Sequence, residues 1–349
     1  MITGRDFIFT GLQPWDISMG SNARDIAIEI AKHNRVLYVN TPLSMFSSDL
    51  QSTDADVQQR LKVLHKQASP IRAIDKNIWL LDFPFTIMPV NSLPDGILFD
   101  IINKLNNKKI FTYINKIANE LDFRDVIHFC DNNIYRSFYA KEYLNTNLNI
   151  YYRRDNLLGI KFWQRHATRL EPKLIAKSNL VVCNSTELTN FAKKYNKNSY
   201  DIGQGVDLST YKISNDNKPT DIENISHPII GYMGDITSVR LDADLIFNLA
   251  KANPNYSFVM VGRIDHVFTT HQLNKLNNVY FLGSKAPNTV PDYINSFDIC
   301  INPQSINQTT IGNYPRKIDE YLSLGKPTIA TKTDTMMMFE PYVYLCRTQ

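Results

Sequence analysis

Short apolar runs alternate with longer amphipathic segments along almost the whole chain. This rhythm is typical of βαβ units, in which helices cover both faces of a parallel sheet. The apolar runs predict strands at 6–11, 36–40, 77–83, 126–130, 149–153, 179–184, 227–234, 256–262, 278–283, 297–302, 326–331 and 343–346. The amphipathic segments predict helices near 21–33, 57–66, 95–121, 242–252, 287–296 and 315–324. The chain should therefore be an α/β protein with doubly wound parallel sheets.

The alternation stops once, in a segment with little apolar periodicity and many turn-forming residues, 207–227. At about 150 residues per domain, a chain of 349 residues has room for two domains. We therefore expect two Rossmann-like domains, at 1–207 and 208–349.

Composition excludes several classes. The chain has 38 Lys and Arg against 34 Asp and Glu, a net charge of +4, and we expect no nucleic-acid partner because such partners need a clustered basic stripe. The four cysteines lie far apart without a CxxC motif, which argues against zinc and for free thiols in a reducing cytoplasm: Cys130, Cys183, Cys300 and Cys346. The sequence shows no signal-peptide pattern and no membrane-spanning apolar run, so we expect a cytoplasmic protein.

Parallel sheets bind ligands at the carboxyl ends of their strands, so the loops there are the first places to look. In the first half, Gly20 and Ser21 open a helix after a long loop, and either Ser21 or Asn22 can cap it. Asp16, His128 and Asp155 also lie near predicted strand ends. These residues are candidates for contact with an acceptor, and ordinary loop or capping roles remain the alternative.

In the second half, Gly234 follows a predicted strand, while Arg240 and Arg263 lie where a cation could neutralise phosphate. Solvated surface arginines are the alternative. Asp242 and Asp244 have the spacing of a metal-binding DxD motif, but acidic residues also favour the start of a helix, and we expect no metal.

The segment 311–331 carries the richest signal. Asn313 is predicted to cap a helix with Pro315 in its first turn, and Gly325 fits the position after its last residue, Leu324. Free amides at the helix start, the cations Arg316 and Lys317, and the carboxylate of Glu320 would together form a site for a nucleoside diphosphate. The carboxylate would accept hydrogen bonds from ribose hydroxyls.

Four segments resemble the family 4 glycosyltransferases of the GT-B fold. They are AKSNLVVCNSTEL, GQGVDLSTY, NNVYFLGSKAPNTVPDYINSFDICINP and NYPRKIDEYLSLGKPTIAT, which occur in the family's order. The last is similar to the family's NPxKxxEYLAxGKPVVAT segment. The resemblance covers most of the chain and implies two Rossmann-like domains facing a central cleft, with further C-terminal elements beyond Gln349.

By position, the resemblance makes Glu320 the second glutamate of the family's E-x7-E element, a ribose ligand, and Arg240 a diphosphate contact. Asp235 stands where the family has an arginine, and Gly312 where it has the first glutamate. The residue pattern and the resemblance together make Arg240 and Lys317 candidate catalytic residues and predict the following donor-binding residues: Glu320, Asn313, Gly312, Arg263, Arg316 and Gly234.

The implied reaction is transfer of a sugar from a nucleoside diphosphate-sugar to a saccharide or lipid-linked acceptor in polysaccharide biosynthesis. It would retain the anomeric configuration and need no metal or other cofactor. A non-catalytic subunit and a nucleotide-sugar epimerase are the alternatives, whereas an NAD-dependent oxidoreductase would want a GxGxxG motif that the sequence lacks. Lysines among apolar residues in 101–120 also predict peripheral membrane contact, with a solvated helix face as the alternative.

Overall fold

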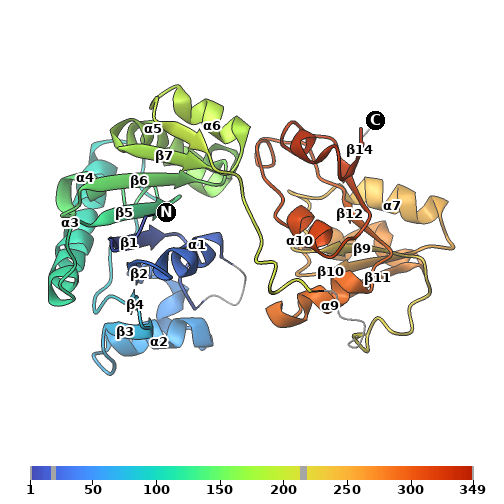
Figure 1. The fold of residues 1–349 in the computed structure, drawn as a ribbon, viewed down its shortest axis with the longest axis horizontal. Helices are drawn as coiled ribbons and strands as arrows, with labels where there is room; N and C mark the ends of the chain where they lie inside the picture. Colours follow the sequence, from blue (N-terminus) through green and yellow to red (C-terminus); the bar gives the residue numbers. More distant parts are fainter. Residues whose placement is uncertain (1, 17–20, 213–217, 348–349) are drawn as a thin grey trace. The chain divides into compact units, whose positions relative to one another are not determined.

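The computed structural model describes residues 2–16, 21–212 and 218–347 and divides into two compact units (Figure 1). The first unit comprises Met1–Cys183 and Leu188–Asp201, and the second Asn184–Glu187 and Ile202–Gln349. Each unit is an α/β sandwich around one sheet, so the predicted fold class is confirmed.

The first unit contains an eight-stranded sheet in the order β3-β4-β2-β1-β5-β6-β7-β8. All neighbouring strands are parallel except β3, which runs antiparallel to β4 at the edge. Its strands are β1 (Asp6–Gly11), β2 (Arg35–Val39), β3 (Ile71–Asp75), β4 (Ile78–Leu81), β5 (Ile127–Asp131), β6 (Leu148–Arg153), β7 (Leu180–Cys183) and β8 (Ser199–Asp201). The sequence did not predict β3 or β8, which are short edge strands with exposed residues.

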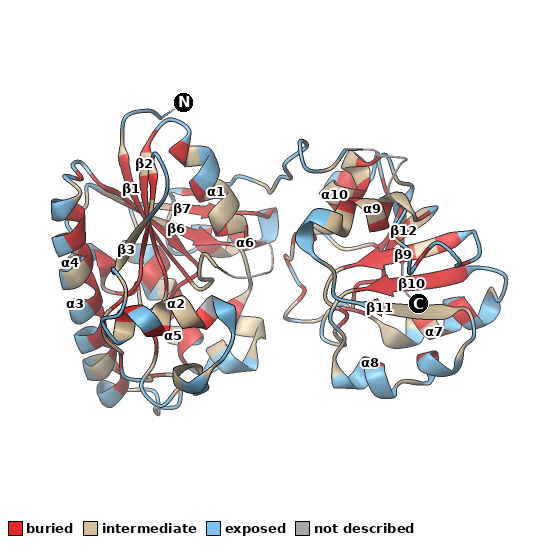
Figure 2. Ribbon diagram, turned by 90° about the horizontal axis from the view of Figure 1, so that it is seen from below, coloured by how far each residue is buried: buried red, intermediate tan, exposed pale blue. Residues whose placement is uncertain are grey.

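In the described part of the chain, the α-helices that surround this sheet are α1 (Asn22–Ala31), α2 (Ala55–Leu64), α3 (Ile97–Glu120), α4 (Ala140–Tyr143), α5 (Lys161–Lys177) and α6 (Thr186–Lys193). The long helix α3 buries one side against the sheet and exposes the other (Figure 2). No helix of the described residues is long and apolar enough to cross a membrane.

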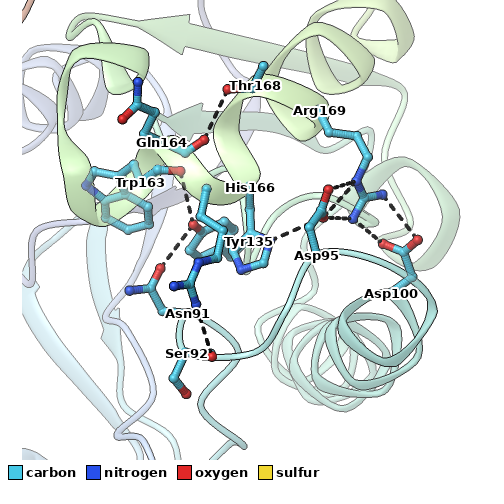
Figure 3. A network of polar contacts seen from close by, with 11 residues as sticks. Asn91, Ser92, Asp95, Asp100, Tyr135, Trp163, Gln164, His166, Thr168 and Arg169 are labelled. Atoms are coloured by element: carbon cyan, nitrogen blue, oxygen red, sulfur yellow. Dashed lines mark hydrogen bonds and ion pairs between the residues drawn. The ribbon is translucent and has the colours of Figure 1, made fainter.

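A polar network fastens the start of α3 to α5 (Figure 3). Arg169 of α5 binds Asp95 at 2.6 Å and Asp100 at 2.9 Å. Next to these two ion pairs, the buried ring of His166 stacks on Phe99 with the ring centroids 4.0 Å apart. A bidentate arginine–carboxylate pair has fixed geometry, so this network orients α3 on the unit.

The second unit contains a six-stranded sheet, parallel throughout, in the order β11-β10-β9-β12-β13-β14. The strands are β9 (Ile229–Met233), β10 (Ser257–Val261), β11 (Val279–Gly283), β12 (Ile299–Asn302), β13 (Thr328–Thr331) and β14 (Tyr344–Cys346). The helices are α7 (Ala243–Ala252), α8 (His266–Thr270), α9 (Val290–Asn295) and α10 (Lys317–Ser323).

Close packing explains one glycine of β9. A Cβ atom on Gly231 would lie 2.1 Å from the ring of Phe297, which belongs to the same buried cluster as Ile229 and Tyr321. Such a distance is far inside van der Waals contact, so this position has to lack a side chain. Buried cysteines complete the packing: Cys130, Cys183 and Cys300 are free and buried, as expected, whereas Cys346 is exposed.

Strand order defines one switch point in each unit. In the first sheet, the strands that follow β1 are added on one side of it, and β5 is then placed on its other side. In the second sheet, β10 and β11 lie on one side of β9, and β12 lies on the other. At such a point the loops leaving two adjacent strands diverge and open a crevice at the carboxyl edge. The two loop sets to examine are therefore those after β1 and β5 and those after β9 and β12.

Candidate donor site

The loop that leaves β9 approaches the loop after β10 very closely. Gly234 has φ = 135° and donates its backbone N–H to the oxygen of Val261 at 2.9 Å. A Cβ on Gly262, which has φ = 149°, would lie 1.9 Å from the Gly234 oxygen. Both positions therefore need glycine, and their backbones lie in close contact after the carboxyl ends of β9 and β10.

Lys317, the first residue of α10, lies beside Gly234. Its ammonium donates a hydrogen bond to the Tyr232 hydroxyl at 2.9 Å and lies 4.6 Å from the centre of the Tyr232 ring. A Cβ on Gly234 would be 3.1 Å from Cε of Lys317. The structure thus brings Gly234 and Lys317 together, with a cation beside close backbone, an arrangement suited to an anion.

Arg263 follows β10 and pairs with Asp235 at 3.0 Å. The arginine side chain is 68% exposed, so this ion pair is weak and can be exchanged for another anion. Asp235 is the residue that stands in place of the family's arginine, and here it holds the neighbouring cation.

Arg240 is held by its backbone in the loop before α7. Its N–H donates to Thr237 and its oxygen accepts from Ser305 at 2.9 Å, which fastens this loop to the one after β12. Its side chain is half-buried, and among the described residues no acidic side chain pairs with it. Arg240 therefore has a guanidinium available beside the switch point.

Asp242 and Asp244 have local structural roles. Asp242 caps α7 by accepting from the backbone of Leu245 at 2.9 Å, and Asp244 lies 3.2 Å from His271. Within the described ranges, no group of three His, Cys, Asp or Glu side chains could hold a metal ion. The capping interpretation of Asp242 is thus the one that the structure supports.

The helix after Asn313 begins later than expected. α10 starts at Lys317 with Arg316 before it, so the prediction that Asn313 caps the helix and Pro315 lies in its first turn is wrong. Asn313 instead closes a turn by donating its backbone N–H to Thr310 at 3.0 Å. The nearby buried side chains of Tyr314 and Pro315 hold the chain outside the helix. The prediction for the other end is confirmed, since Gly325 follows the helix with φ = 66°.

Gly312 has a left-handed backbone, with φ = 72°. Its carbonyl oxygen accepts a hydrogen bond from Ser185, which belongs to the same unit, at 2.7 Å. Gly312 thus contributes a constrained turn at the position where the family has a glutamate.

Glu320 lies one turn into α10 and pairs with Arg316 at 3.4 Å. Both side chains are partly buried. The two residues expected at the donor therefore lie side by side, and their ion pair is also the intrahelical contact that a purely structural role would give.

The sequence did not single out Asp319. One of its carboxylate oxygens accepts from the Tyr314 hydroxyl at 3.0 Å, and the other is buried with no hydrogen-bond partner among the described residues. Burial raises the pKa of Asp319 to about 6, with the Glu320 charge adding to the effect. In the sequence, only its position next to Glu320 could have indicated that Asp319 lies near the candidate site.

The residues of the first unit that were predicted to contact an acceptor have different local roles. Asp16 pairs with Arg72 at 2.6 Å, and Asp155 pairs with Arg154 at 3.1 Å, so both carboxylates lie in charged clusters near the carboxyl edge. Ser21 caps α1, as expected, by accepting from the backbone of Arg24. Gly20 lies outside the described residues.

His128 does not lie at a ligand-binding edge. It is the second residue of β5, 1% exposed, and its two ring nitrogens bind Thr10 and Asn149 at 2.9 Å each. Burial lowers its pKa to about 4, so the ring is neutral near pH 7. The expectation that His128 lies near the carboxyl end of a strand is corrected, because it lies near the opposite end of β5.

Comparison with known proteins finds relatives for the second unit. A family model described as "Glycosyl transferases group 1" matches residues 227–340, which contain strands β9 to β13 and helices α7 to α10. A putative teichuronic acid biosynthesis glycosyltransferase of Bacillus subtilis, TuaH, is 27% identical over 202 residues, 55% of this chain and 50% of that protein. The alignment thus spans about half the length of this curated relative.

Solved structures resemble the chain over almost its whole length. HepE of Anabaena, crystallised with UDP and glucose, gives a TM-score of 0.65 at 19% identity, covering 98% of this chain and 86% of that one. The sucrose-phosphate synthase of Thermosynechococcus elongatus gives a TM-score of 0.66 at 14% identity, covering 99% and 86%. Residues 227–340 are therefore similar to group 1 glycosyl transferases, and the chain has the GT-B fold of these solved structures.

Proposed function

We propose that the chain is a glycosyltransferase that moves a sugar from a nucleoside diphosphate-sugar to a saccharide or lipid-linked acceptor in polysaccharide biosynthesis. The observation that carries this proposal is the match of residues 227–340 to the family, with three cations around the switch point of that same domain: Arg240, Arg263 and Lys317. The UDP complexes of HepE support a nucleotide donor.

In this proposal the cations bind the donor diphosphate. Arg240 offers an available guanidinium, Arg263 exchanges Asp235 for a phosphate oxygen, and Lys317 adds a charge beside Gly234. As the bond between sugar and diphosphate breaks, negative charge grows on the leaving group, and fixed cations stabilise it. Glu320 accepts hydrogen bonds from the ribose.

We further propose that transfer retains the anomeric configuration and proceeds without a metal ion. Support comes from the family resemblance and from the cations, which can neutralise the diphosphate themselves. The experiment is release of nucleoside diphosphate from donor sugars by the purified chain, with and without EDTA. We expect the rate to be unchanged in EDTA, whereas full loss that manganese restores would refute metal independence.

A second candidate is a non-catalytic subunit that binds nucleotide and activates a partner. Gly312, in place of the first glutamate of the family element, is the feature that favours it. Titration with UDP, GDP, ADP and CMP, run beside the hydrolysis assay, separates the two. Binding with donor turnover supports the enzyme, and binding without turnover of any donor supports the subunit.

We also propose that the first unit contacts the inner face of a membrane through α3. This helix exposes the apolar side chains of Ile97, Leu98, Ile101 and Leu105, of which Ile97 is 79% exposed. Lysines lie along the same helix, and a groove of about 460 Å³ is lined by Phe85, Leu105, Lys108, Lys109, Tyr113 and Lys116. Apolar and basic side chains together fit an anionic lipid surface.

A further inference from the structure

Tyr232, the fourth residue of β9, is a buried side chain whose hydroxyl reaches the loop after the strand. It is 0% exposed, and its ring belongs to a buried cluster that includes Leu241, Phe258 and Met260. A side chain packed at the density of a protein interior has little freedom to move. The oxygen of the Tyr232 hydroxyl therefore has a fixed place in the second unit.

This hydroxyl forms two hydrogen bonds, and the chemistry of its partners fixes their directions. It lies 3.0 Å from the carbonyl oxygen of Asp235 and 2.9 Å from the ammonium nitrogen of Lys317. A carbonyl oxygen can only accept, and an ammonium group can only donate. The hydroxyl thus donates its proton to Asp235 and accepts from Lys317, and it connects the loop after β9 to the start of α10.

The ammonium group of Lys317 is held from more than one side. Besides the hydroxyl, the Tyr232 ring attracts it, since the nitrogen lies 4.6 Å from the ring centre. A Cβ atom on Gly234 would lie 3.4 Å from the same nitrogen, so the backbone there is in close contact with it. A lysine side chain is flexible, and here the packing around Tyr232 restricts it before any ligand binds.

Lys317 still has donors available for another group. An ammonium group has three N–H donors, and one of them faces Tyr232. Across residues 2–16, 21–212 and 218–347, no carboxylate pairs with Lys317 and no second acceptor forms a hydrogen bond with its nitrogen. Because the side chain is partly exposed, an anion from solvent can take the remaining donors.

The same hydroxyl supports the loop that holds a second cation. Asp235, whose carbonyl oxygen accepts from Tyr232, pairs through its carboxylate with Arg263 at 3.0 Å. The next residue, Ile236, donates its backbone N–H to the carbonyl oxygen of Arg263 at 2.7 Å. One buried hydroxyl therefore bears directly on the place of Lys317 and, through the loop, on that of Arg263.

We infer that Tyr232 is a positioning residue of the donor site, whose hydroxyl and ring hold the ammonium group of Lys317 where it meets the donor diphosphate. A cation that is already in place stabilises charge on a leaving group without reorganisation during the reaction. The inference rests on the proposed function for the identity of the ligand. Tyr232 is buried, so it acts through Lys317 and not by contact with the substrate.

The test is a double-mutant cycle on the affinity of the whole chain for UDP, GDP and ADP, measured by isothermal titration. Tyr232→Phe keeps the ring and removes the hydroxyl, and we expect it to weaken binding of the tightest of these nucleotides about tenfold, the scale of one charge-assisted hydrogen bond. Lys317→Met should weaken binding by at least as much. In the Lys317→Met background, Tyr232→Phe should change the affinity less than about twofold, because the group that it positions is gone.

The matched control is Tyr293→Phe, which removes another buried tyrosine hydroxyl of the second unit, bonded to Asp221 at 2.6 Å. Both tyrosine variants lose hydrogen bonds, so both should show a small decrease in melting temperature. Only Tyr232→Phe should weaken nucleotide binding. A tyrosine with a purely structural role would behave like Tyr293, and its effect on affinity would not depend on Lys317.

The outcomes separate this inference from the proposed function. Unchanged affinity in Tyr232→Phe, or the same loss with and without Lys317, would overturn the inference and leave the proposed donor site standing. Failure of the wild type to bind any of the three nucleotides would overturn the proposed function, and the inference with it.

Discussion

Arg316 and Glu320 form an ion pair of 3.4 Å one turn apart at the start of α10, within the segment that resembles the family's NPxKxxEYLAxGKPVVAT sequence. The pair is partly buried, so its charges are less screened than those of a surface pair. This contact sets two roles of Glu320 against each other: a ribose ligand, or a helix-stabilising partner of Arg316.

We predict that Glu320→Gln weakens nucleoside diphosphate binding about ten- to a hundredfold. Glutamine keeps the shape but loses the charge, and hydrogen bonds to a charged acceptor contribute about 1.5–3 kcal/mol. Unfolding without ligand should change by less than about 0.5 kcal/mol. Isothermal titration and thermal melting measure the two quantities.

The matched control is Glu340→Gln, which removes an exposed carboxylate of the same unit that pairs with Lys332 at 3.7 Å. It should leave affinity and stability unchanged. If Glu320→Gln keeps the affinity and lowers the melting temperature, Glu320 serves only Arg316 and the ribose assignment is wrong.

Asp319 should make the second unit less stable as pH rises from about 4 to 6. Its pKa is raised by burial to about 6, above the value near 3.9 of an unfolded aspartate. The folded state therefore holds the proton more tightly, and this stabilisation is present below pH 4 and lost as the pH passes 6. Asp319→Asn keeps the acceptor for Tyr314 and should gain about 1–2 kcal/mol at pH 7.5, after allowance for solvent screening.

Urea unfolding at pH 4 and pH 7.5 checks this prediction. The variant should resemble the wild type at pH 4 and exceed it at pH 7.5. Equal differences at both values would mean that Asp319 does not titrate between the two states.

Much of the fold was predictable because a buried parallel strand leaves a strong local signal. The apolar runs identified all the central strands, and Ser21 marked the start of α1. The edge strand β3 escaped because half-exposed residues such as Arg72 and Asp75 carry no apolar run. Asn313 and Pro315 led to a wrong prediction of where α10 begins, because a capping pattern is read from a few neighbouring residues. The burial of Tyr314 depends on the folded unit and cannot be read from those residues.

The site was predictable only where one segment carries several of its residues. Arg316, Lys317 and Glu320 are neighbours in sequence, so the pattern revealed them together. For His128, the sequence located the strand correctly but did not show near which end of the strand the residue lies.

Gly231→Ala should destabilise the second unit by about 1–3 kcal/mol or more, because the added Cβ would lie 2.1 Å from the ring of Phe297. Gly205→Ala is the control, since nothing lies within 4 Å of a Cβ there and its φ is not positive. Denaturant unfolding measures both. A Gly231→Ala protein as stable as the control would mean that Phe297 can move aside without cost.

Membrane contact through α3 should depend on charge and on salt. The exposed side chains of Lys104, Lys108 and Lys109 lie on a helix that also exposes Leu105, and each basic residue near anionic lipid contributes about 1 kcal/mol. The double change Lys104→Glu and Lys108→Glu should therefore abolish co-sedimentation with phosphatidylserine vesicles at low salt. Added salt at 0.5 M should do the same to the wild type, because the Debye length falls from about 30 Å at 0.01 M to less than about 10 Å above 0.1 M. Lys62→Glu, on α2, is the matched control and should still bind. If the wild type fails to bind anionic vesicles, or binds neutral phosphatidylcholine vesicles equally well, α3 is a solvated helix face.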